Sequence, residues 1–252
     1  MRWATRINDA LSEDRFELNF QRITQIGEAT EHGDHYELLI RMRDELGKIV
    51  MLSQFLPAAE RYNLSDKVDR WVIGHALNWL RDHPDMVEQL HLCGINLSGQ
   101  SLGNESVLNL IIDQIDEGSI PAKKLCFEVT ETAATADLEQ ATHFITQLKN
   151  RGCMFALDDF GSGFSSFAYL KKLPVDFSKI DGSFVRDICT DSIDIAMVRS
   201  INEIGHVMGK KTIAEFTEDR EVLDVLRSVG VDYAQGFEIG RPTPIDQFFS
   251  IV

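Results

Sequence analysis

The stretch "DLEQATHFITQLKNRGCMFALDDF", residues 137–160, decides the fold of this chain. Its first part has apolar residues at the spacing of one helix face, namely Leu138, Ala141, Phe144, Ile145 and Leu148. Gly152 supplies a C-terminal stop for that helix, and the apolar run that follows it is typical of a buried strand. A helix, a glycine and a strand in this order form the repeating unit of a parallel α/β fold.

The same unit recurs along most of the chain. Further helical patterns lie at 64–83, 192–209 and 219–230. Runs with strand character lie at 16–23, 36–42, 90–98, 124–131, 153–160, 176–181, 210–216 and 233–239. Because helices that join parallel strands form right-handed crossovers, these runs predict an α/β fold, a modified TIM-type (β/α)8 barrel.

The connection "TQIGEATEHGDH", residues 24–35, breaks this pattern. It is polar, it is punctuated by glycine, and it is too short to hold a crossover helix. Such a link is typical of a hairpin-like turn. One strand near the N-terminus is therefore expected to run antiparallel to the others.

We interpret residues 1–252 as a single domain, because no linker or low-complexity segment divides the chain. The first residues place Trp3, Ile7 and Leu11 on one helix face, as if a helix had been cut from something upstream. We therefore expect residues 1–252 to be the catalytic or binding module excised from a longer, multidomain regulatory protein.

The composition restricts the classes of partner. A formal net charge of −15 argues against binding to a nucleic acid polymer, although metal cations or local Lys and Arg would still allow a small anionic ligand. No apolar run approaches the roughly 18 residues that span a bilayer, and the four cysteines form no C-x-x-C pair. These features predict a cytoplasmic domain without direct membrane insertion, although the full-length protein could be tethered to a membrane.

Polar residues stand at the ends of many strand-like runs, where a barrel of this kind carries its chemistry. They are Asn96, Glu128, Glu131, Asp158, Asp159, Lys179, Asp181, Glu215 and Gln235, and Glu37 lies within the second run. Any one of the acids alone is as readily explained as a surface residue. Together, converging carboxylates require cations, and oxygen ligands without histidine or thiolate select Mg²⁺ or Mn²⁺ over zinc.

Asp158 and Asp159 are adjacent, and a strand that turns at this point can aim both side chains into one cavity. Two metal ions close together use such neighbouring acids as ligands. Lys179 is expected to orient or deprotonate an attacking water or to stabilise phosphate charge, and the alternative is a buried counter-ion. The segment "GSGFSS", residues 161–166, is either a mobile loop over the site or a plain connection to the next helix.

An ordered set of segments resembles the EAL-domain family of bacterial cyclic di-GMP phosphodiesterases over nearly the whole chain. The segments are "YELLIRM" (36–42), "NLS" (96–98), "EVTE" (128–131), "DDFGSGFSS" (158–166), "KIDGSFV" (179–185), "AEF" (214–216) and "QGF" (235–237). Each segment is weak evidence alone, but their order is highly specific. The resemblance implies a (β/α)8 barrel with one antiparallel strand, two Mg²⁺ or Mn²⁺ ions, hydrolysis of cyclic di-GMP to linear 5'-pGpG, and a homodimer.

The resemblance also implies roles for individual residues. The ligands of the first metal would be Glu37, Asn96, Glu128 and Asp158, and Asp159 would hold the second metal with Asp158 shared. The residues that activate or position water would be Lys179 and Glu215, with Glu37 as a catalytic ligand. The residues around the substrate would be Gln21, Leu39, Arg41, Asp181 and Gln235, with Arg41 at a phosphate. The residues that support the loop would be Glu131, Gly161, Ser162 and Gly163.

Three positions depart from the family pattern. Leu38 stands where the family has alanine, and its side chain should point away from that of Glu37 by strand alternation. Arg22 stands where proline is usual, and Phe216 stands where glycine is common. The last two are expected to affect the rim of the pocket, and none removes an expected ligand.

Two other functions compete with hydrolysis as explanations of these residues. A catalytically weak or inactive receptor that binds cyclic di-GMP is the main alternative, but such proteins typically lose metal ligands or the lysine, and both are present here. A Mg²⁺-dependent barrel enzyme that enolises a carboxylate substrate would need a base such as Lys179, and nothing else in the sequence favours it.

Overall fold

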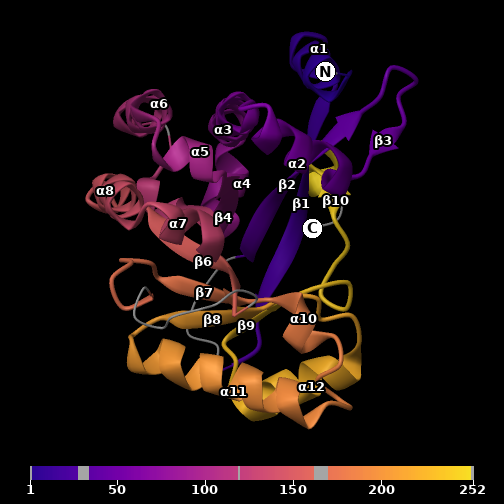
Figure 1. The fold of residues 1–252 in the computed structure, drawn as a ribbon, viewed down its shortest axis with the longest axis vertical. Helices are drawn as coiled ribbons and strands as arrows, with labels where there is room; N and C mark the ends of the chain where they lie inside the picture. The colour runs from indigo at the N-terminus through magenta and orange to yellow at the C-terminus, as the bar shows by residue number, and fades with distance from the viewer. Residues whose placement is uncertain (1, 28–33, 119, 162–169, 251–252) are drawn as a thin grey trace.

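The computed structural model describes residues 2–27, 34–118, 120–161 and 170–250 (Figure 1). Its strands are β1 (Phe16–Gln25), β2 (Asp34–Arg43), β3 (Ile49–Val50), β4 (Leu90–Leu97), β5 (Leu125–Thr130), β6 (Met154–Phe160), β7 (Phe177–Ile180), β8 (Lys211–Ala214), β9 (Tyr233–Gln235) and β10 (Thr243–Pro244). Among the described residues these form one sheet in the order β10-β1-β9-β8-β7-β6-β5-β4-β2-β3. Because β1 also pairs with β2, the strands β1, β2 and β4 to β9 close into a barrel, which confirms the predicted fold.

Among the eight barrel strands, the one that runs against the others is β1. It pairs antiparallel with β2 on one side and with β9 on the other. The pairs from β2–β4 round to β8–β9 are all parallel. The predicted antiparallel strand is therefore confirmed, although residues 28–33 of the connection between β1 and β2 lie outside the described residues.

All eight predicted strands are present, but two of them end two or more residues earlier than predicted. β9 stops at Gln235, and residues 236–239 form a turn in which the Ile239 amide donates to the Gly236 carbonyl. β8 stops at Ala214 because Phe216 adopts a left-handed backbone with φ of 54°. The two-residue strands β3 and β10 were not predicted, since so short a run carries no readable alternation.

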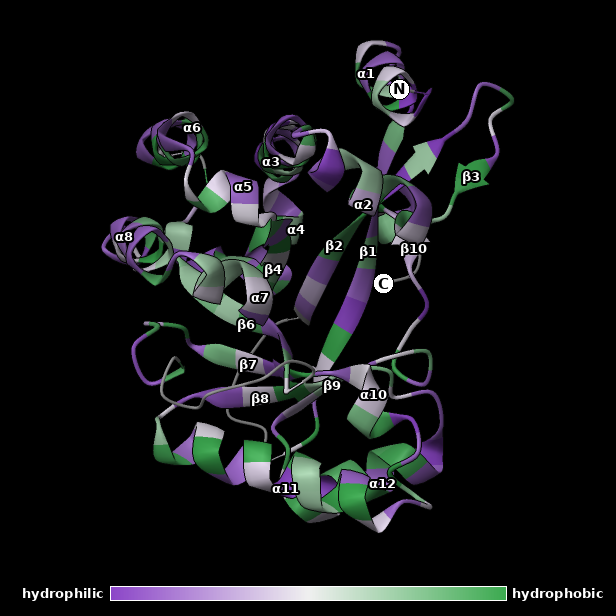
Figure 2. Ribbon diagram, viewed as in Figure 1, coloured by the Kyte–Doolittle hydropathy of each residue, from purple (hydrophilic) through white to green (hydrophobic). Residues whose placement is uncertain are grey.

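Helices cover the outside of the barrel. They are α1 (Arg2–Ser12), α2 (Leu52–Arg61), α3 (Ser65–Asp82), α4 (Pro84–Gln89), α5 (Gly99–Leu102), α6 (Glu105–Asp116), α7 (Glu131–Ala136), α8 (Leu138–Lys149), α10 (Gly182–Val185), α11 (Ser192–Val207) and α12 (Arg220–Val229), with 3-10 helices η1 (Ala122–Lys124) and η2 (Ile245–Ser250). Figure 2 shows hydrophobic and hydrophilic residues alternating along α11 and α12, as expected for helices with one buried face. Gly152 follows α8 with φ of 97°, which confirms it as the predicted stop.

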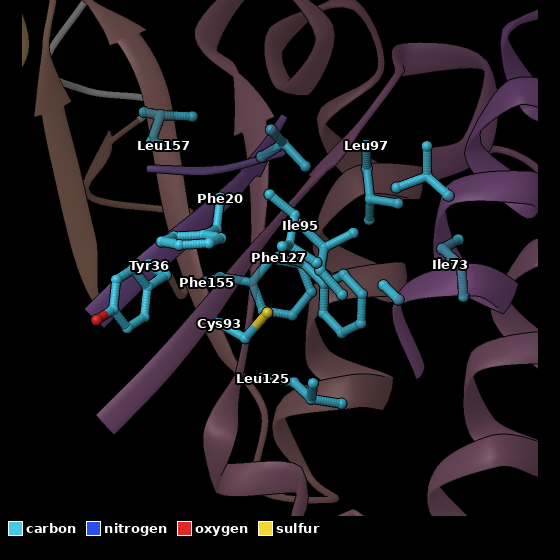
Figure 3. Packing of buried hydrophobic residues seen from close by; sticks show 14 of the residues in the cluster. Phe20, Tyr36, Ile73, Cys93, Ile95, Leu97, Leu125, Phe127, Phe155 and Leu157 are labelled. Atoms are coloured by element: carbon cyan, nitrogen blue, oxygen red, sulfur yellow. The ribbon is translucent and has the colours of Figure 1, made fainter. Parts of the chain in front are cut away.

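Two apolar clusters lie on either side of the strands. The outer one packs the strands against the helices, and Figure 3 shows Ile95, Phe127 and Phe155 gathered there, with the two phenylalanine rings 5.7 Å apart. The inner one fills one end of the barrel and contains Ile23, Leu92, Cys126, Ala156, Phe177, Ile213 and Tyr233. Among the described residues, none of the helices has both the length and the apolar character needed to cross a membrane.

Candidate active site

The barrel interior changes from apolar to polar between one layer of inward-facing side chains and the next layer along the strands. Inward-facing residues alternate with outward-facing ones, so the next inward residue is two positions further on. Two positions from the apolar inner cluster lie Gln21, Gly94, Glu128, Asp158, Lys179, Glu215 and Gln235. Because β1 is reversed, Gln21 precedes Ile23 instead of following it. The polar layer therefore lies toward the C-terminal ends of the parallel strands.

Lys179 is the centre of this layer. Its ammonium nitrogen lies 2.6 Å from Glu128 Oε2, 2.8 Å from Glu215 Oε1, 3.1 Å from Glu37 Oε2 and 3.3 Å from Asp158 Oδ1. The lysine side chain is fully buried. Burial alone lowers the pKa of Lys179, but the surrounding carboxylates outweigh burial and raise this pKa well above its ordinary value. Lys179 is therefore a buried ammonium ion.

Glu37 is held by amide groups as well as by Lys179. Asn96 Nδ2 donates to Glu37 Oε1 at 2.6 Å, and Gln235 Nε2 donates to Glu37 Oε2 at 2.7 Å. Burial opposes ionisation of Glu37, but Lys179 and the two amides outweigh it and lower its pKa. Glu37 is thus an oriented carboxylate.

The other buried acids share one positive charge and are short of partners. Burial, followed by the charge of Glu37, raises the pKa of Glu128 well above its ordinary value. Burial also raises the pKa of Glu215 to about 8, with Asp158 and Glu37 adding to the shift against the effect of Lys179. The site therefore carries more negative charge than Lys179 alone can neutralise.

Asp158 and Asp159 do converge, as the sequence predicted. Carboxylate oxygens of Asp158, Asp159 and Glu215 lie within 4.8 Å of one another. The pairing of β6 with β7 shifts register between Leu157 and Phe160, and Asp159 has a left-handed φ of 54°. This irregularity departs from regular alternation and brings the neighbouring acids to one place. Burial and the charges of Asp158 and Asp181 raise the pKa of Asp159 to about 6.

The residues present fit a divalent metal ion with oxygen ligands. Two buried oxygens of the site, Glu128 Oε1 and Gln235 Oε1, accept no hydrogen bond from the described residues. Asp158 Oδ1 accepts none either, although it lies 3.3 Å from the Lys179 ammonium nitrogen. Burying an oxygen without a hydrogen-bond donor costs folding free energy unless a cation binds to it. Carboxylate and amide oxygens are the ligands that Mg²⁺ and Mn²⁺ prefer. This donor set could therefore hold the predicted ions.

The residues predicted around the substrate surround the same layer. Gln21 Oε1 accepts from Gln235 Nε2 at 3.3 Å, and Leu39 lines a pocket of about 260 Å³ together with Glu37 and Asn96. Arg41 is half-buried two residues beyond Leu39, with Nη1 donating to the Ile40 carbonyl. Asp181 caps α10 by accepting from the Ser183 amide at 2.7 Å, beside Asp159. These residues lie near the site, and their contacts with a substrate stay predictions.

The residues predicted to support the loop are described only in part. Glu131 Oε2 accepts from the Gly161 amide at 3.3 Å, which links the start of α7 to the residue after β6. Gly161 has φ of 100°, a conformation that favours glycine. Ser162 and Gly163 lie outside the described residues, as does the rest of residues 161–166 after Gly161, the segment predicted to be either a mobile loop or a plain connection.

The three departures from the family pattern lie away from the predicted ligand atoms. Leu38 is buried in the outer cluster, which confirms that it points away from Glu37. Arg22 lies exposed on β1. Phe216 is 43 % exposed directly after Glu215, and its ring lies under the guanidinium of Arg186 at 4.3 Å.

Two glycines were not predicted as part of the site. A Cβ at Gly94 would lie 2.2 Å from Glu128 Oε1, so the absence of a side chain gives this carboxylate its room. A Cβ at Gly236 would lie 2.2 Å from the Thr217 carbonyl oxygen, so glycine allows the chain after β8 to cross the chain after β9. The available signals were a glycine inside an apolar strand for Gly94 and one directly after Gln235 for Gly236.

Comparison with known proteins gives a consistent result. The family model described as "EAL domain" matches residues 4–242. The chain is 41% identical over 98% of its length to "Cyclic di-GMP phosphodiesterase PdeB" of Shewanella oneidensis, of which it covers 29%. It is 36% identical over 95% of its length to "Cyclic di-GMP phosphodiesterase PdeF" of Escherichia coli, of which it covers 32%. The chain thus spans about a third of the length of these curated relatives.

Solved structures share the whole fold. The structure described as "PaMucR Phosphodiesterase, c-di-GMP complex" superposes with a TM-score of 0.89 at 29% sequence identity. The match covers 98% of this chain and 99% of that chain. The barrel with its reversed first strand is therefore one already known from solved structures.

Proposed function

The chain belongs to the EAL domain family, and from this membership we propose that it hydrolyses one phosphodiester bond of cyclic di-GMP to give linear 5'-pGpG. In a bacterium this reaction would lower the level of the second messenger. The observation that carries the proposal is the cluster around Lys179, in which Glu37, Glu128, Asp158 and Glu215 surround one buried ammonium ion. Such a cluster serves no purpose in a scaffold, because it is costly to bury.

The donor set supports a two-metal site. Glu37, Asn96, Glu128 and Asp158 would hold one Mg²⁺ or Mn²⁺ ion, and Asp159 would hold a second with Asp158 shared. When bound, such ions lower the pKa of water and neutralise the charge that develops on the phosphate. The closeness of the Asp158, Asp159 and Glu215 oxygens, within 4.8 Å, supports the sharing.

Lys179 and Glu215 would act on the attacking water. The ammonium ion of Lys179 donates hydrogen bonds, so it can orient that water and stabilise negative charge on the phosphate. Its raised pKa supports these roles over the alternative in which Lys179 removes the proton. Glu215, whose Oε1 lies 2.8 Å from the Lys179 ammonium nitrogen, would accept a hydrogen bond from the same water.

The remaining residues would bind the dinucleotide and support the loop. Gln21, Leu39, Asp181 and Gln235 would border the substrate, and Arg41 would contact a phosphate. Glu131 would hold the segment after β6 through Gly161 and so couple the loop to metal binding.

The direct test is to incubate the purified protein with cyclic di-GMP and to separate the nucleotides by chromatography. Linear pGpG that appears with Mg²⁺ or Mn²⁺ and not with EDTA is the expected result. Saturable binding of cyclic di-GMP without any product would overturn the proposal. It would favour the alternative function, a receptor that binds the dinucleotide without cutting it.

Three further expectations concern the protein as a whole. A homodimer is the expected assembly, and light scattering coupled to gel filtration measures it. A longer signalling protein with an upstream sensory or cyclase-type domain is supported by the 29% share of the Shewanella oneidensis relative that the chain covers. A cytoplasmic location stays a prediction that fluorescent tagging in cells would test.

A further inference from the structure

Asp69 on α3 is a buried carboxylate outside the polar layer of the barrel. Asp69 is only 9% exposed to solvent. Its Oδ2 accepts hydrogen bonds from the Ser98 amide at 2.8 Å, the Ser98 hydroxyl at 2.6 Å and the Ser101 hydroxyl at 2.6 Å. A buried carboxylate with this many short contacts to one segment fixes that segment strongly.

The segment that Asp69 fixes is the junction between β4 and α5. Ser98 follows the last residue of β4 and occupies the N-cap position of α5. Its side chain nevertheless accepts no capping hydrogen bond from α5, while its hydroxyl donates to Asp69. The end of β4 is therefore held by a distant helix and not by the local cap that a serine normally provides.

Asn96 lies two residues before Ser98 on the same strand end. Its Nδ2 donates to Glu37 Oε1 at 2.6 Å, which commits the amide nitrogen and leaves the amide oxygen to face a cation. Asp69, Ser98, Asn96 and Glu37 also line one pocket. Asp69 is thus linked by hydrogen bonds to Ser98, by the backbone through Leu97 to Asn96, and from Asn96 by a hydrogen bond to Glu37.

We propose that Asp69 is a positioning residue that aims the Asn96 amide at the metal site through Ser98. Asp69 contacts neither the metal nor the substrate in this scheme, which rests on the proposed two-metal function. Residues that orient metal ligands from outside the ligand set typically change metal affinity or activity by about 10–100-fold. Asp69 belongs to this class.

The test compares Mn²⁺ binding of four variants by electron paramagnetic resonance of the free ion. In Asp69→Ala the dissociation constant of the tighter Mn²⁺ ion should rise about tenfold or more. Asp69→Asn keeps an acceptor oxygen and should recover much of the affinity. Ser98→Ala removes one of the donors with little risk to folding, and it should weaken Mn²⁺ binding in the same direction.

Asp232→Ala is the matched control. Asp232 Oδ2 likewise accepts from a backbone amide, that of Thr212 at 2.8 Å, and from the Thr212 hydroxyl at 3.1 Å, but at the other end of the barrel. It should lower thermal stability without changing the Mn²⁺ dissociation constant. If Asp69→Ala and Asp232→Ala bind Mn²⁺ equally well, or if Asp69→Ala binds as the unmodified protein does, Asp69 is merely structural and the proposal is wrong.

A second readout needs neither metal nor turnover. In ¹H–¹⁵N spectra of the metal-free protein, the side-chain amide of Asn96 should be shifted by its bond to Glu37, and Asn96→Asp identifies the signal. In Asp69→Asn this signal should stay near its original position, whereas in Ser98→Ala and Asp69→Ala it should move toward that of an exposed asparagine. An unmoved signal in the last two variants would overturn the proposal, whereas a chain that binds Mn²⁺ without cutting cyclic di-GMP would contradict only the proposed hydrolysis.

Discussion

At the scale of single residues, the site depends on Lys179, whose single positive charge offsets only part of the negative charge of the surrounding carboxylates. Lys179 is completely buried, and the carboxylates of Glu37, Glu128, Asp158 and Glu215 lie within 3.3 Å of its nitrogen. Removing either sign of charge from such a cluster leaves the other buried without a partner. The metal-free protein and the metal-bound protein should therefore respond differently to the same substitution.

Glu37→Ala should lower hydrolysis of cyclic di-GMP by roughly 100-fold or more, because it removes an expected metal ligand together with the acceptor of the Asn96 and Gln235 amides. Initial rates at saturating Mg²⁺ measure the effect. Leu38→Ala is the control, since Leu38 points into the outer cluster, and its rate should stay within about threefold of the unmodified protein. Near-normal turnover in Glu37→Ala would contradict the assigned role.

Lys179→Met should lower the free energy of unfolding in EDTA by roughly 3–5 kcal/mol, because the buried carboxylates lose their only close cation among the described residues. Mg²⁺ should restore part of this loss. Lys149→Met is the control: Lys149 pairs with Asp176 where both side chains are about a quarter exposed, so its loss should cost about 1 kcal/mol or less. Urea denaturation of the unmodified protein and of both variants, with and without Mg²⁺, measures these free energies of unfolding. Equal losses of unfolding free energy in Lys179→Met and Lys149→Met would contradict the argument that the buried cluster depends on its lysine.

At the scale of elements, backbone hydrogen bonds join the chain after β8 to the chain at the end of β9, next to Glu215 and Gln235. The Thr217 amide donates to the Gln235 carbonyl at 2.9 Å, and the Glu238 amide donates to the Thr217 carbonyl at 3.0 Å. Phe216 supports the crossing with its left-handed φ of 54°, a conformation that costs free energy in a residue other than glycine. Both strand ends must therefore move together.

Gly236→Ala should disrupt this crossing, because the added Cβ would lie within 2.5 Å of the Thr217 backbone. We expect a loss of stability of about 2 kcal/mol or more, and a lower rate even below the melting temperature, since Glu215 and Gln235 are displaced. Gly74→Ala on α3 is the control, because its Cβ meets nothing within 4 Å, and it should be neutral or stabilising by up to ~1 kcal/mol. Thermal unfolding and initial rates of hydrolysis of the two variants measure these effects. A Gly236→Ala protein that is as active and as stable as the unmodified protein would contradict the steric argument.

At the scale of the whole molecule, the raised carboxyl pKa values make stability depend on pH. Glu215 has a pKa of about 8, above its ordinary value of 4.5, so the folded state binds this proton more tightly than the unfolded state. Its contribution to stability is complete below pH 4.5 and is lost as the pH rises through 8. The raised pKa of Asp159, about 6, acts in the same direction over a lower range.

The metal-free protein should therefore unfold more easily at pH 8.5 than at pH 6, and Mg²⁺ should remove most of this difference by binding the ionised acids. Urea denaturation in EDTA and in Mg²⁺ at several pH values measures it. In Glu215→Gln the slope in EDTA should be smaller. A stability in EDTA that rises over this range would contradict the raised pKa values.

The sequence predicted the barrel because the evidence for it is local. Helix periodicity, a glycine stop and an apolar run, as at 137–160, each concern a few neighbouring residues. The predicted positions of Asn96, Glu128 and Lys179 followed from strand ends that meet at one face. Asp69, Gly94 and Gly236 could not be predicted in the same way, because their importance depends on atoms of Ser98, Glu128 and Thr217 that approach them only in the folded chain.

The reversal of β1 places the N-terminal helix at the end of the barrel that carries the polar layer. In an ordinary (β/α)8 barrel the chain enters the first strand from the far end. Here Phe16, at the start of β1, pairs with Met42 near the end of β2, and Arg6 of α1 reaches Glu45 just beyond it. Gln21, which contacts Gln235 in the polar layer, is only five residues from Phe16 along β1. A small displacement of α1 would thus be transmitted along β1 directly to Gln21 in the polar layer. It would not have to pass through the strands and helices on the other side of the barrel.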